Sequence, residues 1–148
     1  MHHSSAARGV RLGFAVLLLD LACRTAAAAM TTPPLAPCPE TPNCVSSLSD
    51  DPDRRVAPIA FTGDAAEAFA RLARLVEATP RTRVVERRPD YLRVEFTSRL
   101  FGFVDDVELV LDAPGRVIQV RSASRVGYWD LGANRRRVED LRERFSGA

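Results

Sequence analysis

The sequence has 148 residues, of which 21 are basic and 19 are acidic, and its formal net charge is +2. Every basic side chain is an arginine, and both histidines, His2 and His3, lie at the start of the chain. Without lysine or histidine beyond that point, Schiff-base chemistry, a Ser-His or Cys-His nucleophile pair and a His-rich metal site are excluded. From Met30 onward the arginines and acidic residues balance, so we expect no nucleic-acid partner.

Residues 1–29 have the layout of a secretory signal peptide, with arginines before a short apolar run and small residues after it. Cleavage after the small residues would release a soluble exported protein. Alternatively, the Leu-Ala-Cys sequence that ends at Cys23 resembles a lipoprotein box, in which Cys23 would carry the lipid. A third interpretation is that translation starts at Met30. We expect an exported protein, periplasmic or anchored to a membrane by lipid, with a cytoplasmic product as the alternative.

Residues 30–58 are rich in proline and show no helical or alternating apolar pattern, which predicts an extended arm. Within CPETPNC, prolines and an asparagine can bend the chain so that Cys38 and Cys44 close a short loop with a disulfide. Two reduced thiols are the alternative. This disulfide and Val45 are the candidate anchors of the arm. Because the arm has no histidine and no second cysteine pair, we expect no zinc site. We also expect no other metal and no cofactor.

Residues 59–148 are predicted to form one α+β domain that begins with a helix between Asp64 and Pro80. Asp64 suits the N-cap position, because its carboxylate can accept a backbone amide of the first turn. Pro80 follows the predicted end of the helix. Apolar residues recur at helical spacing and form one face, whose members are Ala65, Phe69, Leu72, Leu75 and Val76.

Two predicted hairpins follow the helix. Their strands span 81–88, 91–99, 103–112 and 117–124. Pro89-Asp90 marks the first turn and residues 113–116 the second. In the second strand the apolar side chains alternate with polar ones, so we expect one row to face the core, formed by Leu92, Val94 and Phe96.

A second helix is predicted over residues 134–145, with Val138, Leu141 and Phe145 on one stripe. Two ion pairs are expected along it at a spacing of four residues, namely Arg135 with Glu139 and Arg136 with Asp140. The order is then helix, four strands, helix, joined by short connections. This order favours a four-stranded antiparallel sheet with both helices on one face, a two-layer α+β fold.

Three separated blocks carry a family resemblance. They are CPETPNCVSS (38–47), YLRVEFTSRLFGFVDDVEL (91–109) and IQVRSASRVGYWDLGANRRRVEDLRERF (118–145). In this order they resemble the family called domain of unknown function 1499, whose members are small bacterial and plastid proteins. The resemblance covers nearly everything after Pro37. It implies no reaction and brings no catalytic residue with it.

A polar cluster is predicted where the strands end. In an antiparallel sheet, the ends of the second and fourth strands lie beside the start of the third, so their side chains can meet. We expect an ion-pair network there, with an arginine-lined pocket for a carboxylate, phosphate or sulfate as the functional alternative. Because adjacent strand residues point to opposite faces, only one of the two aspartates can face a given pocket. The candidate residues are Arg99, Asp105, Asp106, Arg121, Ser122, Ser124, Arg125, Asn134 and Arg135.

Tyr128 and Trp129 lie in the loop before the last helix. We expect this aromatic pair to close over the edge of the core. Stacking on a ligand and dipping into a membrane surface are the alternatives.

The sequence favours a non-enzymatic accessory or binding domain of the cell envelope, which holds an anionic small molecule, a lipid headgroup or a carboxylate of a partner protein. One alternative is an enzyme acting on an anionic substrate, with Asp105 or Asp106 as base and Arg121 or Arg125 as clamp. Another is a purely structural protein. Membrane contact is expected only through a lipid anchor.

Overall fold

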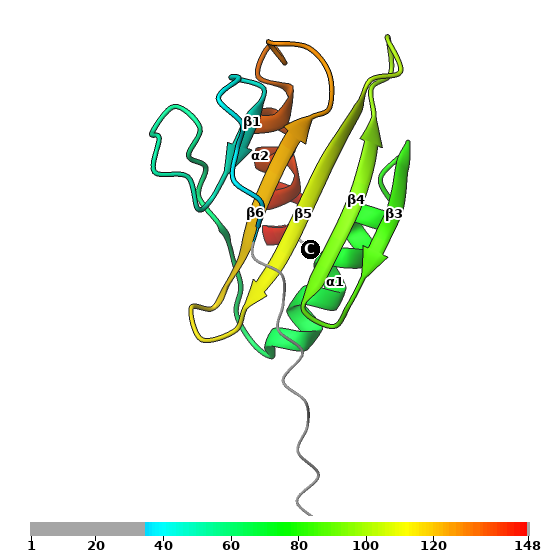
Figure 1. Ribbon diagram of the computed structural model, residues 1–148. Helices are drawn as coiled ribbons and strands as arrows, with labels where there is room; N and C mark the ends of the chain where they lie inside the picture. The colour runs from blue at the N-terminus through cyan, green and yellow to red at the C-terminus, as the bar shows by residue number, and fades with distance from the viewer. Residues whose placement is uncertain (1–34, 148) are drawn as a thin grey trace, which may run out of the picture. The chain divides into compact units, whose positions relative to one another are not determined.

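A computed structural model describes residues 35–147, so the predicted leader and Cys23 lie outside the described residues. The described chain is an α+β fold in two layers, with two helices packed on an antiparallel sheet (Figure 1). The elements in chain order are β1 (Cys44–Ser46), β2 (Ile59–Ala60), α1 (Ala65–Glu77), β3 (Thr82–Arg87), β4 (Tyr91–Thr97), β5 (Val104–Asp112), β6 (Val117–Ser124) and α2 (Ala133–Ser146).

The sheet has six strands, so the prediction of four is wrong. Its order is β1-β6-β5-β4-β3, and β2 also pairs with β6. The two additional strands are short, and both lie along β6: Val45 pairs with Ser122, and Ile59 pairs with Ile118. Strands of this length leave no periodic pattern in the sequence, because pairing with β6 rather than their own alternation defines them.

The predicted hairpins are confirmed. β3 pairs with β4 around the Pro89-Asp90 turn, and β5 pairs with β6 around residues 113–116. The predicted inward row of β4 is buried, with Leu92 and Val94 fully buried and Phe96 nearly so.

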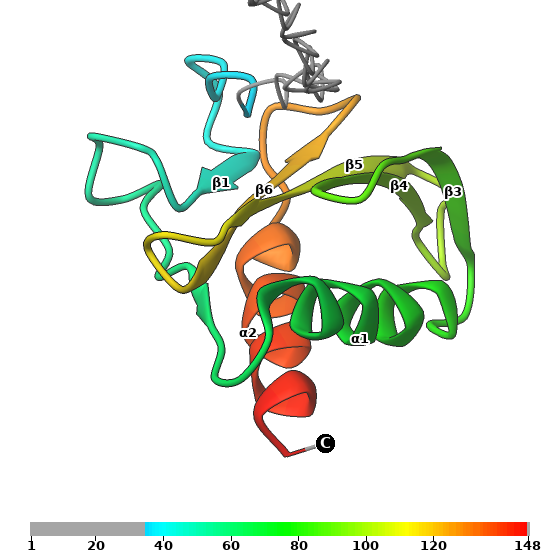
Figure 2. The same cartoon turned by 90° about the horizontal axis from the view of Figure 1, so that it is seen from below.

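Both helices cover the same face of the sheet (Figure 2), as predicted. Asp64 caps α1, since its side chain accepts the amide of Glu67 at 2.9 Å. The predicted apolar stripes of both helices enter one core together with the inward rows of the sheet. The helix residues buried there are Ala68, Phe69, Leu72, Ala73, Val76, Val138, Leu141 and Phe145.

The ion pairs expected along α2 are wrong. Glu139 pairs with Arg142, and Asp140 pairs with Arg144 at 3.2 Å. Arg135 instead donates to the carbonyls of Asp53 and Arg55, and Arg136 donates to that of Leu131. The helix therefore directs arginines of its first turn toward neighbouring backbone, where carbonyl oxygens accept their guanidinium protons.

A disulfide joins Cys38 to Cys44, with 5.6 Å between their Cα atoms. Arg54 supports the same loop, because its guanidinium donates to the carbonyls of Pro39 and Glu40. Val45 is buried in the core, so both predicted anchors of the arm are confirmed. Neither helix within residues 35–147 has the length and apolar character needed to cross a membrane.

Candidate functional site

The residues predicted to form one polar site lie on opposite faces of the sheet. Asp105 and Asp106 are successive residues of β5, so their side chains point to opposite sides. Asp105 lies opposite Ser124 on the face that the helices cover, whereas Asp106 lies opposite Ala123 on the other face. As expected from the alternation of a strand, only one of the two aspartates faces each side, and the pleat divides the strand-end residues into an inner cluster and an outer network.

The inner cluster joins Asp105 and Ser122 of the sheet to Asn134 and Arg137 of α2. One nitrogen of Arg137, Nη1, lies 2.9 Å from Ser122 Oγ and 2.6 Å from Asn134 Oδ1. The other, Nη2, forms an ion pair with Asp105. Ser122 Oγ also lies 2.6 Å from Asn134 Oδ1, and both residues are fully buried. These contacts fix the start of α2 against β5 and β6.

Asn134 also links the inner cluster to the arm. Its Nδ2 lies 3.0 Å from the carbonyl of Asn43 and 3.0 Å from Ser124 Oγ. Asn43 in turn donates to the carbonyl of Gly127 at 2.6 Å. Every one of these polar groups has a partner inside the domain, so the cluster is a closed structural network rather than a vacant anion pocket.

Asp130 completes the N-terminus of α2. The residue at the N-cap position is Gly132, which has no side chain to offer, and Asp130 accepts the amides of Gly132 at 2.9 Å and Asn134 at 2.8 Å. Burial raises the pKa of Asp130, but these amide hydrogen bonds outweigh it and lower the pKa below its usual value. The carboxylate therefore acts as an ionised helix cap.

The outer network lies on the sheet face opposite the helices. Arg125 bridges two carboxylates, with its Nε 2.7 Å from Asp106 Oδ2 and its Nη2 2.5 Å from Glu95 Oε1. Further arginines, Arg93 and Arg83, pair with the same carboxylates at 3.2 Å and 2.6 Å. Hydrogen bonds from Arg125 are the main reason that the pKa values of Glu95 and Asp106 are lowered.

Arg121 belongs to the same face. It pairs with Glu108 at 2.9 Å, and the hydroxyl of Tyr91 donates to that carboxylate at 3.0 Å. Burial and the Glu108 charge raise the pKa of Tyr91, so the phenol stays protonated. Arg121 and Arg125, which were the candidates for binding an anion, are therefore both engaged by carboxylates of this chain.

The two remaining predicted residues lie apart from both groups. Arg99 is exposed in the turn between β4 and β5. Arg135 contacts the carbonyls of Asp53 and Arg55 at 2.7 Å and 3.0 Å and so holds a turn of the arm.

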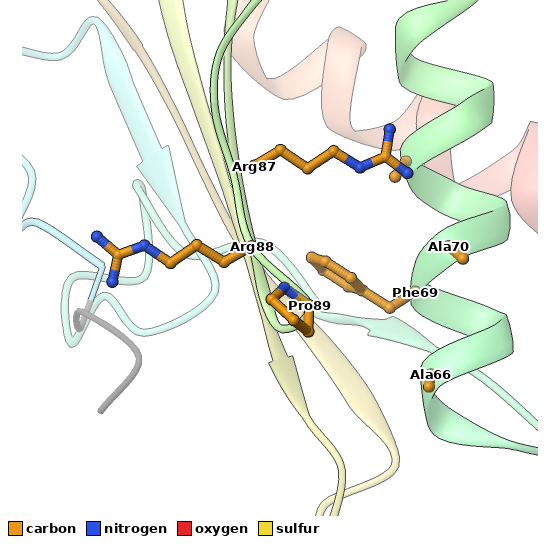
Figure 3. Close-up of a pocket in the computed structure, with 7 residues that line it drawn as sticks. Ala66, Phe69, Ala70, Arg87, Arg88 and Pro89 are labelled. Carbon is orange, nitrogen blue, oxygen red and sulfur yellow. The ribbon is translucent and has the colours of Figure 1, made fainter. Parts of the chain in front are cut away.

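A groove of about 420 Å³ lies between α1 and the β3–β4 turn. Phe69 and alanines of α1 line one wall, and Arg87, Arg88 and Pro89 line the other. In Figure 3, Arg87 extends toward α1 whereas Arg88 extends away from it. Arg87 pairs with Glu77 of α1, and Arg88 pairs with Glu86. The groove is thus mainly apolar, and its rim arginines already have partners.

A group of large hydrophobic side chains is exposed at one end of the sheet. They come from the β4–β5 turn, residues 98–103, and from the β6–α2 loop, residues 125–132, which project from the same end (Figure 1). The loops are neighbours, since the amide of Arg125 donates to the carbonyl of Val104 at 3.1 Å. We call this surface the two-loop end. Its members are between 51% and 84% exposed, and they are Leu100, Phe101, Phe103, Val126, Tyr128, Trp129 and Leu131.

The expectation that Tyr128 and Trp129 close over the core is wrong, because these side chains are 60% and 70% exposed. They contact one another edge to face, with ring centroids 5.6 Å apart. Phe101 and Phe103 form a second pair, stacked at 5.5 Å. Each loop therefore presents its own aromatic pair to the outside.

Hydrogen bonds close the first loop, and a left-handed residue shapes the second. The amide of Ser98 donates to the Phe103 carbonyl at 2.7 Å, and the amide of Phe103 donates back to Ser98 Oγ at 2.9 Å. In the second loop Leu131 has a φ of 51°, a left-handed conformation that costs an apolar residue about 1 kcal/mol or more. Leu131 is also the most exposed member of the two-loop end, so a strained backbone presents an apolar side chain to solvent.

Arginines flank the two-loop end. Arg99 lies in the first loop, and Arg81 lies beside it, with Nε 3.2 Å from the carbonyl of Thr97. Arg136 lies at the second loop, with Nη1 2.8 Å from the carbonyl of Leu131. The guanidinium groups of Arg81 and Arg136 contact backbone carbonyls, which leaves their formal charge in place, and Arg99 is exposed, so these three arginines give the apolar surface a cationic border.

Sequence reasoning missed the two-loop end as a unit, and it also missed Arg137 and Asn43 as partners of the inner cluster. The apolar side chains were available as a signal, because Leu100 and Phe101 interrupt an otherwise polar turn.

The family model described as Protein of unknown function (DUF1499) matches residues 34–145. No curated protein and no solved structure has a significant match.

Proposed function

The chain belongs to the DUF1499 family, whose description assigns no activity, and we propose that it is a non-enzymatic binding module of the cell envelope. We further propose that its binding surface is the two-loop end. The observation that carries this proposal is the exposure of large apolar side chains on two adjacent, hydrogen-bonded loops, bordered by arginines. A contiguous exposed apolar patch usually marks an interaction surface, whereas single exposed apolar residues are common and carry no such meaning.

The surroundings of Asp105 and Asp106 favour a binding function over a catalytic one. Asp105 is paired with Arg137, and Asp106 accepts hydrogen bonds from Arg125 and Arg93. The lowered pKa of Asp106 makes it a weak base near neutral pH, whereas a general base works best with a pKa near the operating pH. The alternative of an Asp base with an Arg clamp therefore lacks a suitable base at the predicted position.

The Cys38–Cys44 disulfide supports an envelope location, because disulfides persist mainly outside the cytoplasm. The leader-like composition of residues 1–29 points the same way. Arg121 and Arg125, two of the candidates for an anion pocket, are paired with carboxylates of this chain, so we place the binding surface at the two-loop end instead.

The test is cell fractionation of the full chain in a bacterial host, in a Cys23→Ser background so that lipidation cannot anchor the protein. A Phe101→Ser/Trp129→Ser variant removes aromatic side chains from both loops. The matched control, Leu48→Ser/Val85→Ser, removes exposed apolar side chains elsewhere on the surface. Retention in the envelope fraction is measured for each protein by immunoblot and compared with a periplasmic marker.

We expect the parent and the control to remain largely with the envelope and the loop variant to be released with the soluble marker. Release of all three proteins, or retention of all three, would show that the two-loop end is not the binding surface. A parent chain found reduced in the cytoplasm would overturn the envelope location.

A further inference from the structure

We infer that the two-loop end binds directly to a lipid bilayer that contains anionic phosphoglyceride headgroups. This inference rests on the proposed function and names the partner of the same surface. Both loops would enter the interfacial region of one leaflet, while the sheet and helices stay in water.

The side chains of the two-loop end suit the boundary between lipid and water. Tyr128 and Trp129 combine an apolar ring with a polar group, and such residues concentrate at membrane interfaces. Phe101 and Leu100, at the tip of the other loop, are 71% and 80% exposed and can enter the acyl region. Polarity falls from water through the headgroups to the acyl chains. A projecting turn with a polar base and an apolar tip matches this decrease.

The shape also favours a bilayer. The apolar groups project from two separate loops, and the groove beside α1 involves none of them. Trp129 also borders a hollow against the arm, with Pro42 and Arg135. A protein partner would need two pockets at a fixed spacing to bury both tips. A fluid lipid surface accommodates both tips without a matching shape.

The positive charge of the bordering arginines favours lipids with anionic headgroups. Arg81, Arg99 and Arg136 border the apolar side chains, and their guanidinium groups can contact phosphate oxygens when the tips are inserted. Each arginine near an anionic surface strengthens binding by a factor of about five. Asp130 of the second loop keeps its negative charge but directs its carboxylate toward the amides that begin α2. Asp51 and Asp53 of the arm line the hollow beside Trp129 together with Arg54 and Arg135.

Trp129 makes the inference directly measurable, because it is the only tryptophan in the chain. Purified full-length protein is mixed with vesicles of phosphatidylcholine alone and with vesicles that also contain phosphatidylglycerol. The emission of Trp129 is recorded, and the measurement is repeated with lipids brominated on acyl carbons near the headgroup, which quench an inserted indole. Because the signal arises only at Trp129, adsorption through the leader does not mimic it.

We expect a shift of emission to shorter wavelength and quenching by the brominated lipids, both requiring phosphatidylglycerol and both weakened by salt. Phe101→Ser should weaken partitioning at least about tenfold, because it removes an apolar side chain that would be buried in lipid. Leu48→Ser is the matched control and should leave partitioning unchanged. Arg99→Gln should weaken partitioning about fivefold, whereas Arg144→Gln, near the other end of α2, changes the net charge equally and should have little effect.

Unchanged Trp129 emission, whether or not the protein sediments with vesicles, would overturn the inference. Equal quenching in phosphatidylcholine vesicles would overturn the selection for anionic headgroups. If Trp129 stays unquenched while loop-dependent retention in the envelope persists in cells, the partner is a protein. In that case the bilayer inference fails and the proposed function stands.

Discussion

Arg137 of α2 and Asp105 of β5 form an ion pair beneath the sheet, with side chains only 14% and 7% exposed. The same guanidinium lies 5.0 Å from the ring centroid of Phe96 and contacts both Ser122 and Asn134. The contact therefore joins the beginning of α2 to the start of β5 and to the ends of β4 and β6. It lies below the two-loop end and supports the base of both loops.

Removing the arginine should destabilise the domain strongly. Arg137→Leu leaves the Asp105 carboxylate buried without its cation, so the free energy of unfolding should fall by about 3–5 kcal/mol. Urea denaturation followed by circular dichroism measures this loss. Arg144→Leu breaks the exposed pair with Asp140 and should cost less than about 1 kcal/mol. Comparable losses for the two variants would contradict the structural role given to the buried pair.

Stability should fall in acid because of the outer network and the α2 cap. The pKa values of Glu95, Asp106 and Asp130 are lower in the folded state than their usual values. Their stabilisation is therefore complete above about pH 4–5, and it is lost as the pH falls through the unfolded-state values near 4 toward the lower folded-state values. Urea midpoints measured between neutral pH and about pH 3 should show this decline.

An Arg125→Gln variant isolates the outer network. Hydrogen bonds from Arg125 are the largest cause of the lowered pKa of Glu95 and of Asp106, so this variant should lose less stability than the parent over the same acid range. Arg144→Gln is the control with the same change in charge. An acid response identical to that of the parent would show that Arg125 does not set these pKa values.

Leu131→Asn should separate stability from binding. Asparagine tolerates the left-handed conformation better than leucine does, so the variant should gain about 0.5–1 kcal/mol of stability. It should also bind anionic vesicles more weakly, because an exposed apolar side chain is lost from the two-loop end. Thermal denaturation and the Trp129 emission assay measure the two effects. A less stable variant would contradict the backbone strain at Leu131. Unchanged binding to vesicles would contradict a role for its side chain in the two-loop end.

The Cys38–Cys44 disulfide should be present in protein isolated from cells. Intact mass after alkylation without reduction should show both cysteines protected, and reduction should expose them. Replacing both cysteines by alanine should cost about 2 kcal/mol, because the bond closes a short loop in the unfolded chain. Full alkylation of freshly isolated native protein would argue against export.

Local pattern was sufficient for most of the fold. The spacing of Phe69, Leu72 and Val76 indicated α1, and the alternation around Leu92 and Val94 indicated β4, because burying one face imposes the period of the element on the sequence. Asp64 was recognisable as a cap for the same local reason, since its partner amide is only three residues away.

β1 and β2 were beyond such reasoning. Three residues and two residues are too few to show a period, and their pairing depends on where β6 lies in the folded chain. The partner of Asp105 was also out of reach, because Arg137 lies on a different element and many other arginines of this chain were equally plausible candidates.

The amino-acid sequence alone settles the secondary structure of the long elements and the α+β class, because these depend on residues near one another in the chain. It also settles the absence of lysine and, through the match over residues 34–145, the family. The tertiary structure decides which arginines are paired and which surface stays apolar and open. Ion pairing and exposure depend on contacts between residues far apart in the chain, and only the assembled sheet brings residues 98–103 beside residues 125–132.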